Sequence, residues 1–185
     1  MLVLEETELL PLIGARAGDP EAWRTLFERF RLPLFSYLTQ LTGDQEASLD
    51  LIQETFLSAT RFITTLRSDD KFAGWLFGIA RQKVIQTWRK KRLPMISLDE
   101  TTQDESLFES STPSPSEFLI LEENENNFWD ALNGLSVVHK EVIVLFFLEE
   151  FSLEEIAEIT GTSVGTTKSR LFYARKNFKE FYEKH

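Results

Sequence analysis

The sequence predicts an all-α protein made of two small helical domains that are joined by a flexible acidic linker. Apolar residues recur at spacings of three and four in both halves of the chain, whereas β-branched alternation is scarce. Between the halves lies a segment rich in Ser, Thr, Pro and acids, with too few large apolar residues to form a core. Near the C-terminus, two short helical patterns flank Gly161, which predicts a helix-turn-helix in the second domain.

Composition also places the domain boundaries. Residues 94–115 are predicted to be the linker, which leaves an N-terminal domain at about residues 5–93 and a C-terminal domain at about 116–185. Pro94 ends the preceding helix, and Pro113 and Pro115 precede the next one. A linker of about 20 residues spans up to ~70 Å when extended, so the two domains can reach separate sites.

The charge of the chain is distributed unevenly. The net charge is −10, and the segments 1–93, 94–127 and 128–185 contribute +1, −9 and −2. Local basic clusters indicate nucleic-acid binding better than the net charge does. There are two such clusters: Arg81, Lys83, Arg89, Lys90, Lys91 and Arg92 in the first domain, and Lys168, Arg170, Arg175, Lys176 and Lys179 in the second.

Several classes of protein are disfavoured by composition. The chain has no cysteine, which excludes disulfides and Cys-ligated zinc, and His139 and His185 are too far apart for a His-based metal site. No nucleophile–base pattern or P-loop is present, so we expect no catalytic residue, cofactor or metal. Apolar runs are shorter than the ~18 residues of a membrane span. The N-terminal MLVLEETELL carries acids where a signal peptide carries cations, so a cytoplasmic protein is expected.

The first domain is predicted to hold three helices. Pro33 lies inside the first and suggests a kink or a break. Gly43-Asp44 forms a turn, and Ser68 or Asp69 is the expected N-cap of the third helix, which could extend to Arg92. The apolar stripes are Trp23, Leu26, Phe27, Phe30, Leu34 and Leu38; then Leu49, Ile52, Phe56 and Leu57, with Phe62 a further candidate; then Phe72, Trp75, Leu76, Ile79 and Ala80.

The second domain begins with a helix marked by Phe118, Leu121, Phe128 and Leu132, followed by a turn at residues 134–136. Residues 142–148 are seven apolar residues in a row, a pattern that fits a buried strand as well as a helix. We favour a helix because the neighbouring elements are helical.

The two helices of the helix-turn-helix have recognisable ends. Ser152 and Glu155 form an S-x-x-E capping box at the start of the first helix. Gly161 supplies the turn, and Ser163 is the expected cap of the second helix. The residues expected to pack are Ile156 and Ala157 in the first helix, and Val164 and Leu171, with Phe172 or Ala174, in the second.

The second of these helices carries the residues expected to meet DNA. Its first two turns would enter the major groove, where Arg170 suits a bidentate pair with guanine and Lys168 a phosphate contact. The alternative is an amphipathic helical hairpin with a solvated basic face. The predicted contact residues are Ser163, Thr166, Thr167, Lys168, Ser169, Arg170, Tyr173, Arg175 and Lys176.

Three stretches of the sequence carry a family resemblance. EEIAEITGTSVGTTKSRLFYARK resembles the second conserved module of the extracytoplasmic-function (ECF, group IV) sigma factors of bacterial RNA polymerase. DLIQETFLSATRFI resembles the core-binding helix of that family, and KFAGWLFGIARQKVIQTWRKKR resembles its promoter-melting and minus-10 helix. The order of module, linker and module also matches. Many members carry Val where this chain has Thr167, a departure that affects promoter sequence and not the class.

The resemblance implies a monomeric transcription-initiation subunit. Its expected partners are core RNA polymerase, contacted through the two largest subunits, then promoter DNA, and an anti-sigma factor. The first module would bind core polymerase, melt DNA and recognise the minus-10 element, and the second would read the minus-35 element. The alternative is a helix-turn-helix regulator that is not a polymerase subunit, although the sequence shows no sensing domain for one.

The resemblance also implies site residues in the first module. The matching core-binding positions are Asp50, Leu51, Gln53, Glu54 and Phe56, although core packing explains Leu51 and Phe56 equally well. Single-strand binding uses aromatic residues beside cations, yet packing remains the favoured role for Phe72 and Trp75. The minus-10 and melting positions are Arg67, Lys71, Phe72, Trp75, Arg81, Lys83, Arg89, Lys90 and Arg92.

Overall fold

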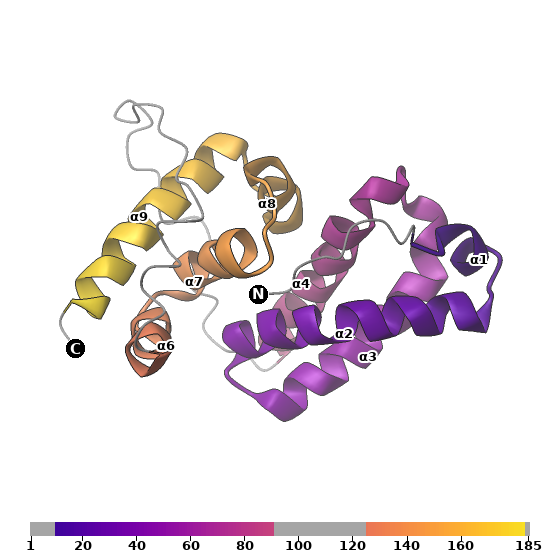
Figure 1. The fold of residues 1–185 in the computed structure, drawn as a ribbon, viewed down its shortest axis with the longest axis horizontal. Helices are drawn as coiled ribbons and strands as arrows, with labels where there is room; N and C mark the ends of the chain where they lie inside the picture. The colour runs from indigo at the N-terminus through magenta and orange to yellow at the C-terminus, as the bar shows by residue number, and fades with distance from the viewer. Residues whose placement is uncertain (1–9, 91–124, 184–185) are drawn as a thin grey trace. The chain divides into compact units, whose positions relative to one another are not determined.

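The computed structural model describes residues 10–90 and 125–183, which fall into two compact units divided between Leu93 and Pro94 (Figure 1). Every regular element within these described ranges is helical. The predicted linker, the predicted helix residues Phe118 and Leu121, and the site residue Arg92 lie outside them.

The N-terminal unit contains a short helix and three long ones. These are α1 (Leu12–Arg16), α2 (Pro20–Thr42), α3 (Gln45–Phe62) and α4 (Phe72–Lys90). Two 3-10 turns, η1 (Ile63–Thr65) and η2 (Asp69–Lys71), connect α3 to α4. The three long helices pack against one another in pairs, and α1 lies against α2 and η1.

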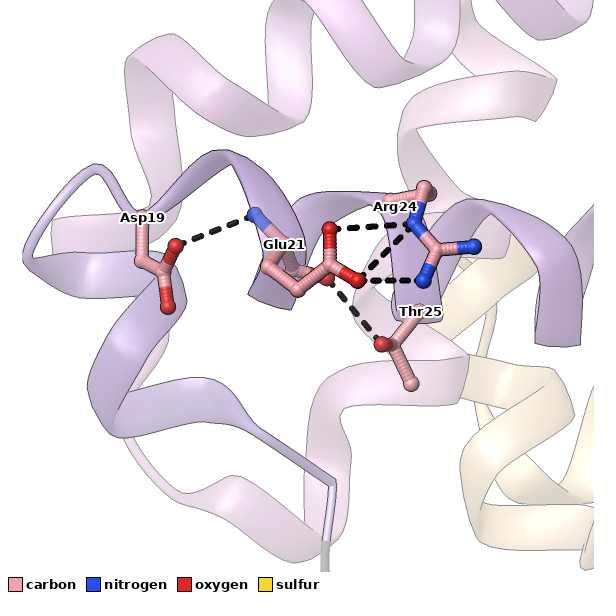
Figure 2. Close-up of polar contacts among 4 residues, drawn as sticks. All are labelled: Asp19, Glu21, Arg24 and Thr25. Atoms are coloured by element: carbon pink, nitrogen blue, oxygen red, sulfur yellow. Dashed lines mark hydrogen bonds and ion pairs between the residues drawn. The ribbon is translucent and has the colours of Figure 1, made fainter.

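Local capping explains where α2 and α3 begin. Asp19 accepts a hydrogen bond of 3.0 Å from the Glu21 backbone N–H, and Pro20 occupies the first helical position (Figure 2). Figure 2 also shows the Glu21–Arg24 ion pair and the Thr25 hydroxyl, which donates to the Glu21 carbonyl at 3.0 Å. Gly43 ends α2 at φ 67°, and Asp44 then caps α3. The predicted Gly43-Asp44 turn is therefore confirmed.

The break suggested at Pro33 does not occur, because α2 is continuous through it. Leu26, Leu34, Tyr37 and Leu38 are all fully buried on one side of α2, so tertiary packing offsets the lost backbone hydrogen bond.

Three members of the predicted α3 stripe are wrong. Leu49, Leu57 and Phe62 are exposed by 53%, 59% and 55%. The buried positions of α3 are instead Ser48, Leu51, Ile52, Thr55, Phe56 and Ala59, a helical face that includes two hydroxyl residues. The Thr55 hydroxyl donates to the Leu51 carbonyl at 2.6 Å, which satisfies it within the helix.

Over residues 125–183, the C-terminal unit contains four helices and a π-helical turn. The elements are α6 (Glu125–Asn133), α7 (Val137–Ile143), the π turn η5 (Val144–Leu148), α8 (Leu153–Thr160) and α9 (Val164–Tyr182). The apolar run at 142–148 is therefore helical, and the strand alternative is wrong. Helix α9 contacts α6, α7 and α8, so it is the central element of this unit.

The turn between η5 and α8 contains a backbone exception. Glu150 has φ 59°, the left-handed region that non-glycine residues rarely adopt. Beside it, the carboxyl of Glu149 is largely buried, and this burial raises its pKa to about 8. Both residues precede the helix-turn-helix directly.

Candidate nucleic-acid interface

Helices α8 and α9 form the predicted helix-turn-helix, and the capping predictions are confirmed. The Ser152 hydroxyl accepts from the Glu155 backbone N–H at 3.2 Å, while the Glu155 carboxylate accepts from the Ser152 N–H at 2.8 Å. Gly161 ends α8 at φ 67°. Ser163 caps α9 by accepting from the Thr166 N–H at 3.0 Å. The start of α9 is thereby fixed by side-chain hydrogen bonds.

One face of α9 is exposed and basic. Lys168, Phe172 and Lys176 follow one another at intervals of four residues, and all three are exposed. The sequence left open whether Phe172 or Ala174 packs against the neighbouring helices. Ala174 is fully buried, whereas Phe172 is 53% exposed. Tyr173 and Arg175 are half-buried beside this face, and the Phe172 and Tyr173 rings meet edge to face. Phe172 is therefore an exposed aromatic residue between two cations.

The opposite face of α9 holds three residues that were predicted to contact DNA. Thr167, Ser169 and Arg170 are buried, and only 4% of Arg170 is exposed. The charge of Arg170 also contributes to lowering the pKa of His139 in α7, after desolvation as the first cause. Arg170 thus points into the unit, and the predicted guanine pair does not fit this placement.

Thr167 has a structural partner that accounts for its burial. Its hydroxyl lies 3.1 Å from that of Thr162, which in turn lies 2.9 Å from that of Thr160. It also donates to the Ser163 carbonyl at 3.1 Å. These bonds join the end of α8 to the start of α9.

The spacing of residues could have identified Phe172 as a surface residue. The buried positions Thr167, Leu171, Ala174 and Phe178 recur at steps of three and four, and Phe172 does not belong to that series. The signal was present in the sequence, but a large aromatic residue suggested packing.

Helix α3 carries the predicted core-polymerase contacts. Asp50, Gln53 and Glu54 are exposed, whereas Leu51 and Phe56 are buried, and the Phe56 ring meets Phe27 with centroids 5.0 Å apart. The packing alternative therefore accounts for Leu51 and Phe56. The exposed Leu49 and Leu57 extend the same face as the polar residues.

The end of α3 exposes Phe62, and the segment between α3 and α4 exposes Arg67 and Lys71. Phe72 is fully buried against Phe30, with ring centroids 5.3 Å apart, and Trp75 is half-buried beside it. Packing therefore explains Phe72. Phe62, at the end of α3, is an exposed aromatic residue that the sequence did not single out as a DNA contact.

The cations of α4 are placed differently from one another. Arg89 and Lys90 are exposed, while Arg81 is half-buried. Lys83 Nζ lies 3.7 Å from Glu54 Oε2, so a predicted DNA contact pairs with a predicted polymerase contact. No helix in the described ranges combines the length and the apolar character needed to cross a membrane.

Comparison with known proteins identifies both units. Residues 26–93 match the family model of sigma-70 region 2, and residues 125–178 match that of sigma-70 region 4. The ECF RNA polymerase sigma-E factor of Haemophilus influenzae is 30% identical over 164 residues, which cover 86% of each chain. The ECF RNA polymerase sigma factor SigL of Mycobacterium tuberculosis is 32% identical over 165 residues, covering 87% of this chain and 89% of its own.

Solved structures share the fold. The sigma factor RpoE in complex with the anti-sigma factor NepR, from Bartonella quintana, matches with a TM-score of 0.63 and 25% identity, over 86% of this chain and 98% of that one. CnrH, solved with the cytosolic domain of CnrY, matches with a TM-score of 0.64 at 20% identity, over 94% and 95% of the chains. With two family models in the expected order and a relative that is similar over most of its length, the chain belongs to the ECF RNA polymerase sigma factors.

Proposed function

We propose that this chain is a group IV sigma factor that binds core RNA polymerase through α3, opens promoter DNA with the α3–α4 segment and α4, and reads the minus-35 element with α9. It performs no catalysis, needs no cofactor, is a monomer when free and acts in the cytoplasm. The observation that carries the minus-35 role is the exposed basic face of α9, which starts at a capped turn.

The α9 contact set differs from the sequence prediction in two respects: Phe172 joins it, and three buried residues leave it. Lys168 and Lys176 would meet phosphates on either side of Phe172, whose ring suits apolar contact with a thymine methyl group. Ser163 and Thr166 lie at the N-terminus of this 19-residue helix, where backbone amides favour a phosphate. Tyr173 and Arg175 flank the face. Thr167, Ser169 and Arg170 would support the helix from inside.

The polymerase-binding face of α3 would combine polar and apolar contacts. Asp50, Gln53 and Glu54 supply the polar part, and Leu49 and Leu57 supply two exposed apolar side chains on the same helix. Protein interfaces bury apolar residues at their centre within a polar rim. Two leucines exposed by more than half on a helix of this kind are consistent with a partner surface.

The minus-10 region would use the exposed residues that precede α4 together with the cations of α4. Arg67 precedes the turn η2 and Lys71 ends it, and Phe62 offers an aromatic face for an unstacked base. Arg81, Lys83, Arg89 and Lys90 would follow the backbone along α4. Each unit contributes few cations, so the free protein should bind DNA weakly and the polymerase should supply the remaining affinity.

We also propose that an anti-sigma factor controls the chain and that residues 94–115 link the domains 5–93 and 116–185. The relative from Bartonella quintana was solved with such a partner. The same polymerase- and DNA-facing residues would then be the ones that the partner covers.

Reconstitution with bacterial core polymerase tests the function. The wild type should give promoter-specific transcription, and Phe172→Ala should reduce it by about tenfold, because losing recognition of one base pair costs roughly 1–3 kcal/mol. Leu32→Ala is the matched control, since Leu32 is 56% exposed on α2, a helix that carries none of the proposed contacts. If the chain bound a specific site tightly alone and core enzyme added nothing, the regulator alternative would replace this proposal.

A further inference from the structure

The segment Arg67–Lys71, here called the melting loop, is exposed between two buried anchors. Leu66 precedes it and Phe72 follows it, and both side chains are buried. All five residues between them are exposed. Within the loop, the Lys71 N–H donates to the Ser68 carbonyl at 3.2 Å, and Ser68 hydrogen bonds to the Asp70 carboxylate. The loop itself therefore has little apolar packing to hold its shape.

Helix α1 is fixed firmly beside this loop. Leu12 and Ala15 are buried, and the Trp23 indole N–H donates to the Ala15 carbonyl at 3.0 Å. A Cβ atom at Gly14 would come within 3.0 Å of the Ala22 Cβ, which shows how closely α1 approaches α2. Figure 1 shows α1 next to the turns that lead from α3 to α4. Thus α1 offers a rigid point of attachment.

One ion pair connects this support to the loop. Arg16 Nη2 lies 2.5 Å from Asp69 Oδ1, between residues 53 positions apart. Hydrogen bonding to Asp69 raises the pKa of Arg16. Asp69 was expected to be a possible helix cap, but its carboxylate points to α1 instead. The contact joins the central residue of the loop to a different element.

We propose that Arg16 is a positioning residue for the melting loop: by pairing with Asp69 it holds Arg67 and Lys71 in the arrangement that captures single-stranded promoter DNA. This inference rests on the proposed minus-10 function of the loop. It extends that function to α1, which the sequence prediction did not connect with DNA.

Charge neutralisation is the competing explanation. The loop carries two cations and two acids, so Arg16 also offsets one carboxylate that would repel phosphate. Charge-matched variants separate the two effects. Arg16→Gln/Asp69→Asn removes the ion pair but keeps the net charge of the wild type. Arg16→Glu/Asp69→Arg also keeps that net charge and restores a pair with reversed direction.

The experiment measures binding of reconstituted holoenzyme to a fluorescent single strand that carries the minus-10 sequence. Arg16→Gln and the Gln/Asn double variant should each bind about three- to fivefold more weakly, the range expected for losing an exposed ion pair. The reversed pair should recover most of the affinity. Binding to a duplex that carries only the minus-35 element should stay unchanged, since α9 is not affected.

Hydrogen exchange of the free chain provides a readout that does not depend on DNA. The exchange rate of the amides in residues 67–71 should increase in Arg16→Gln and in Arg16→Gln/Asp69→Asn. In Arg16→Glu/Asp69→Arg it should return to the wild-type rate. Unchanged exchange, or wild-type DNA binding by the Gln/Asn variant, would overturn the positioning role. Lys71→Ala separates the two failures. If Lys71→Ala weakens single-strand binding while Arg16→Gln does not, Arg16 has no positioning role. If neither variant has an effect, the proposed function of the loop fails, and the inference about Arg16 fails with it.

Discussion

The two candidate DNA-contacting regions are held in place by different means. Helix α9 begins at a capped turn and keeps Thr167 and Arg170 buried beneath its exposed face. The melting loop is exposed along its length and is tied to α1 through the Arg16–Asp69 pair. Removing a buried polar residue is costly, whereas an exposed ion pair contributes only ~0–1 kcal/mol. The proposed minus-35 helix is therefore preorganised, whereas the melting loop can change its conformation at low cost.

The largest expected effect concerns the aromatic residues around the loop. Phe72→Ala should destabilise the N-terminal unit by about 3–5 kcal/mol, because it empties a fully buried site beside Phe30. Phe62→Ala should leave stability within about 0.5 kcal/mol but weaken single-strand binding by holoenzyme. Urea denaturation and strand binding check the pair. A stable Phe72→Ala protein that fails to bind DNA would show that Phe72 contacts the base.

Arg170 gives the corresponding test in the C-terminal unit. Arg170→Ala should cost about 2–3 kcal/mol because the side chain is buried, and it should weaken minus-35 binding only through this loss of stability. Hydrogen exchange measured separately for peptides of the two units checks the effect. Lys168→Ala is the control and should lose DNA affinity with the fold intact. A normally folded Arg170→Ala protein without minus-35 recognition would restore the guanine contact predicted from the sequence.

The next effect depends on pH. The Glu149 carboxyl has a pKa of about 8 in the folded chain, raised by desolvation from 4.5, so folding favours its protonated form. The protonated carboxyl therefore adds its full contribution to the free energy of unfolding below pH 4.5, and this contribution is lost as the pH rises to 8. Glu149→Gln should raise the stability of the C-terminal unit at pH 8.5 by on the order of 1–3 kcal/mol. At acid pH the variant and the wild type should have equal stability.

The quantity to follow with pH is the difference in unfolding free energy between Glu149→Gln and the wild type. The effects of the other titrating groups cancel in this difference. Burial lowers the pKa of His139, so that group costs stability when the pH falls, which is opposite in sign. A pH-independent difference between Glu149→Gln and the wild type would contradict the assignment to Glu149.

The smallest effect concerns the left-handed backbone at Glu150. Glu150→Gly should stabilise the C-terminal unit by about 0.5–1 kcal/mol, because glycine adopts positive φ without steric cost. The same substitution in α8, Glu154→Gly, should instead destabilise it by about 1 kcal/mol. Thermal unfolding of both variants gives the comparison. Equal effects of the two substitutions would show that the turn at Glu150 carries no strain.

Sequence patterns predicted elements better than they predicted which side chains are exposed. The capping box at Ser152, the glycine turn at Gly161 and the cap at Ser163 were all correct, because these depend on a few neighbouring residues. Leu57 was expected to be buried, and Phe172 was one of two alternatives for packing, yet both side chains are exposed. An apolar residue one position away from a buried stripe is ambiguous until the neighbouring helices are known.

Pairings between distant elements were beyond the sequence altogether. Arg16 and Asp69 are 53 residues apart, and Lys83 and Glu54 lie on separate helices. The sequence predicted a role for Asp69, Lys83 and Glu54 from the segment around each residue, and it predicted none for Arg16. Charged residues of opposite sign are frequent in this chain, so no spacing singles out a pair until the fold places them together.

The small number of cations that each unit would place on DNA has a consequence for where the protein resides in a cell. Nonspecific affinity for a chromosome grows with the number of phosphates neutralised, and with few contacts it falls to the weak end of the range of about 10⁻⁴–10⁻⁶ M. Genomic DNA is then a poor sink for the free chain, which leaves it available to bind core enzyme.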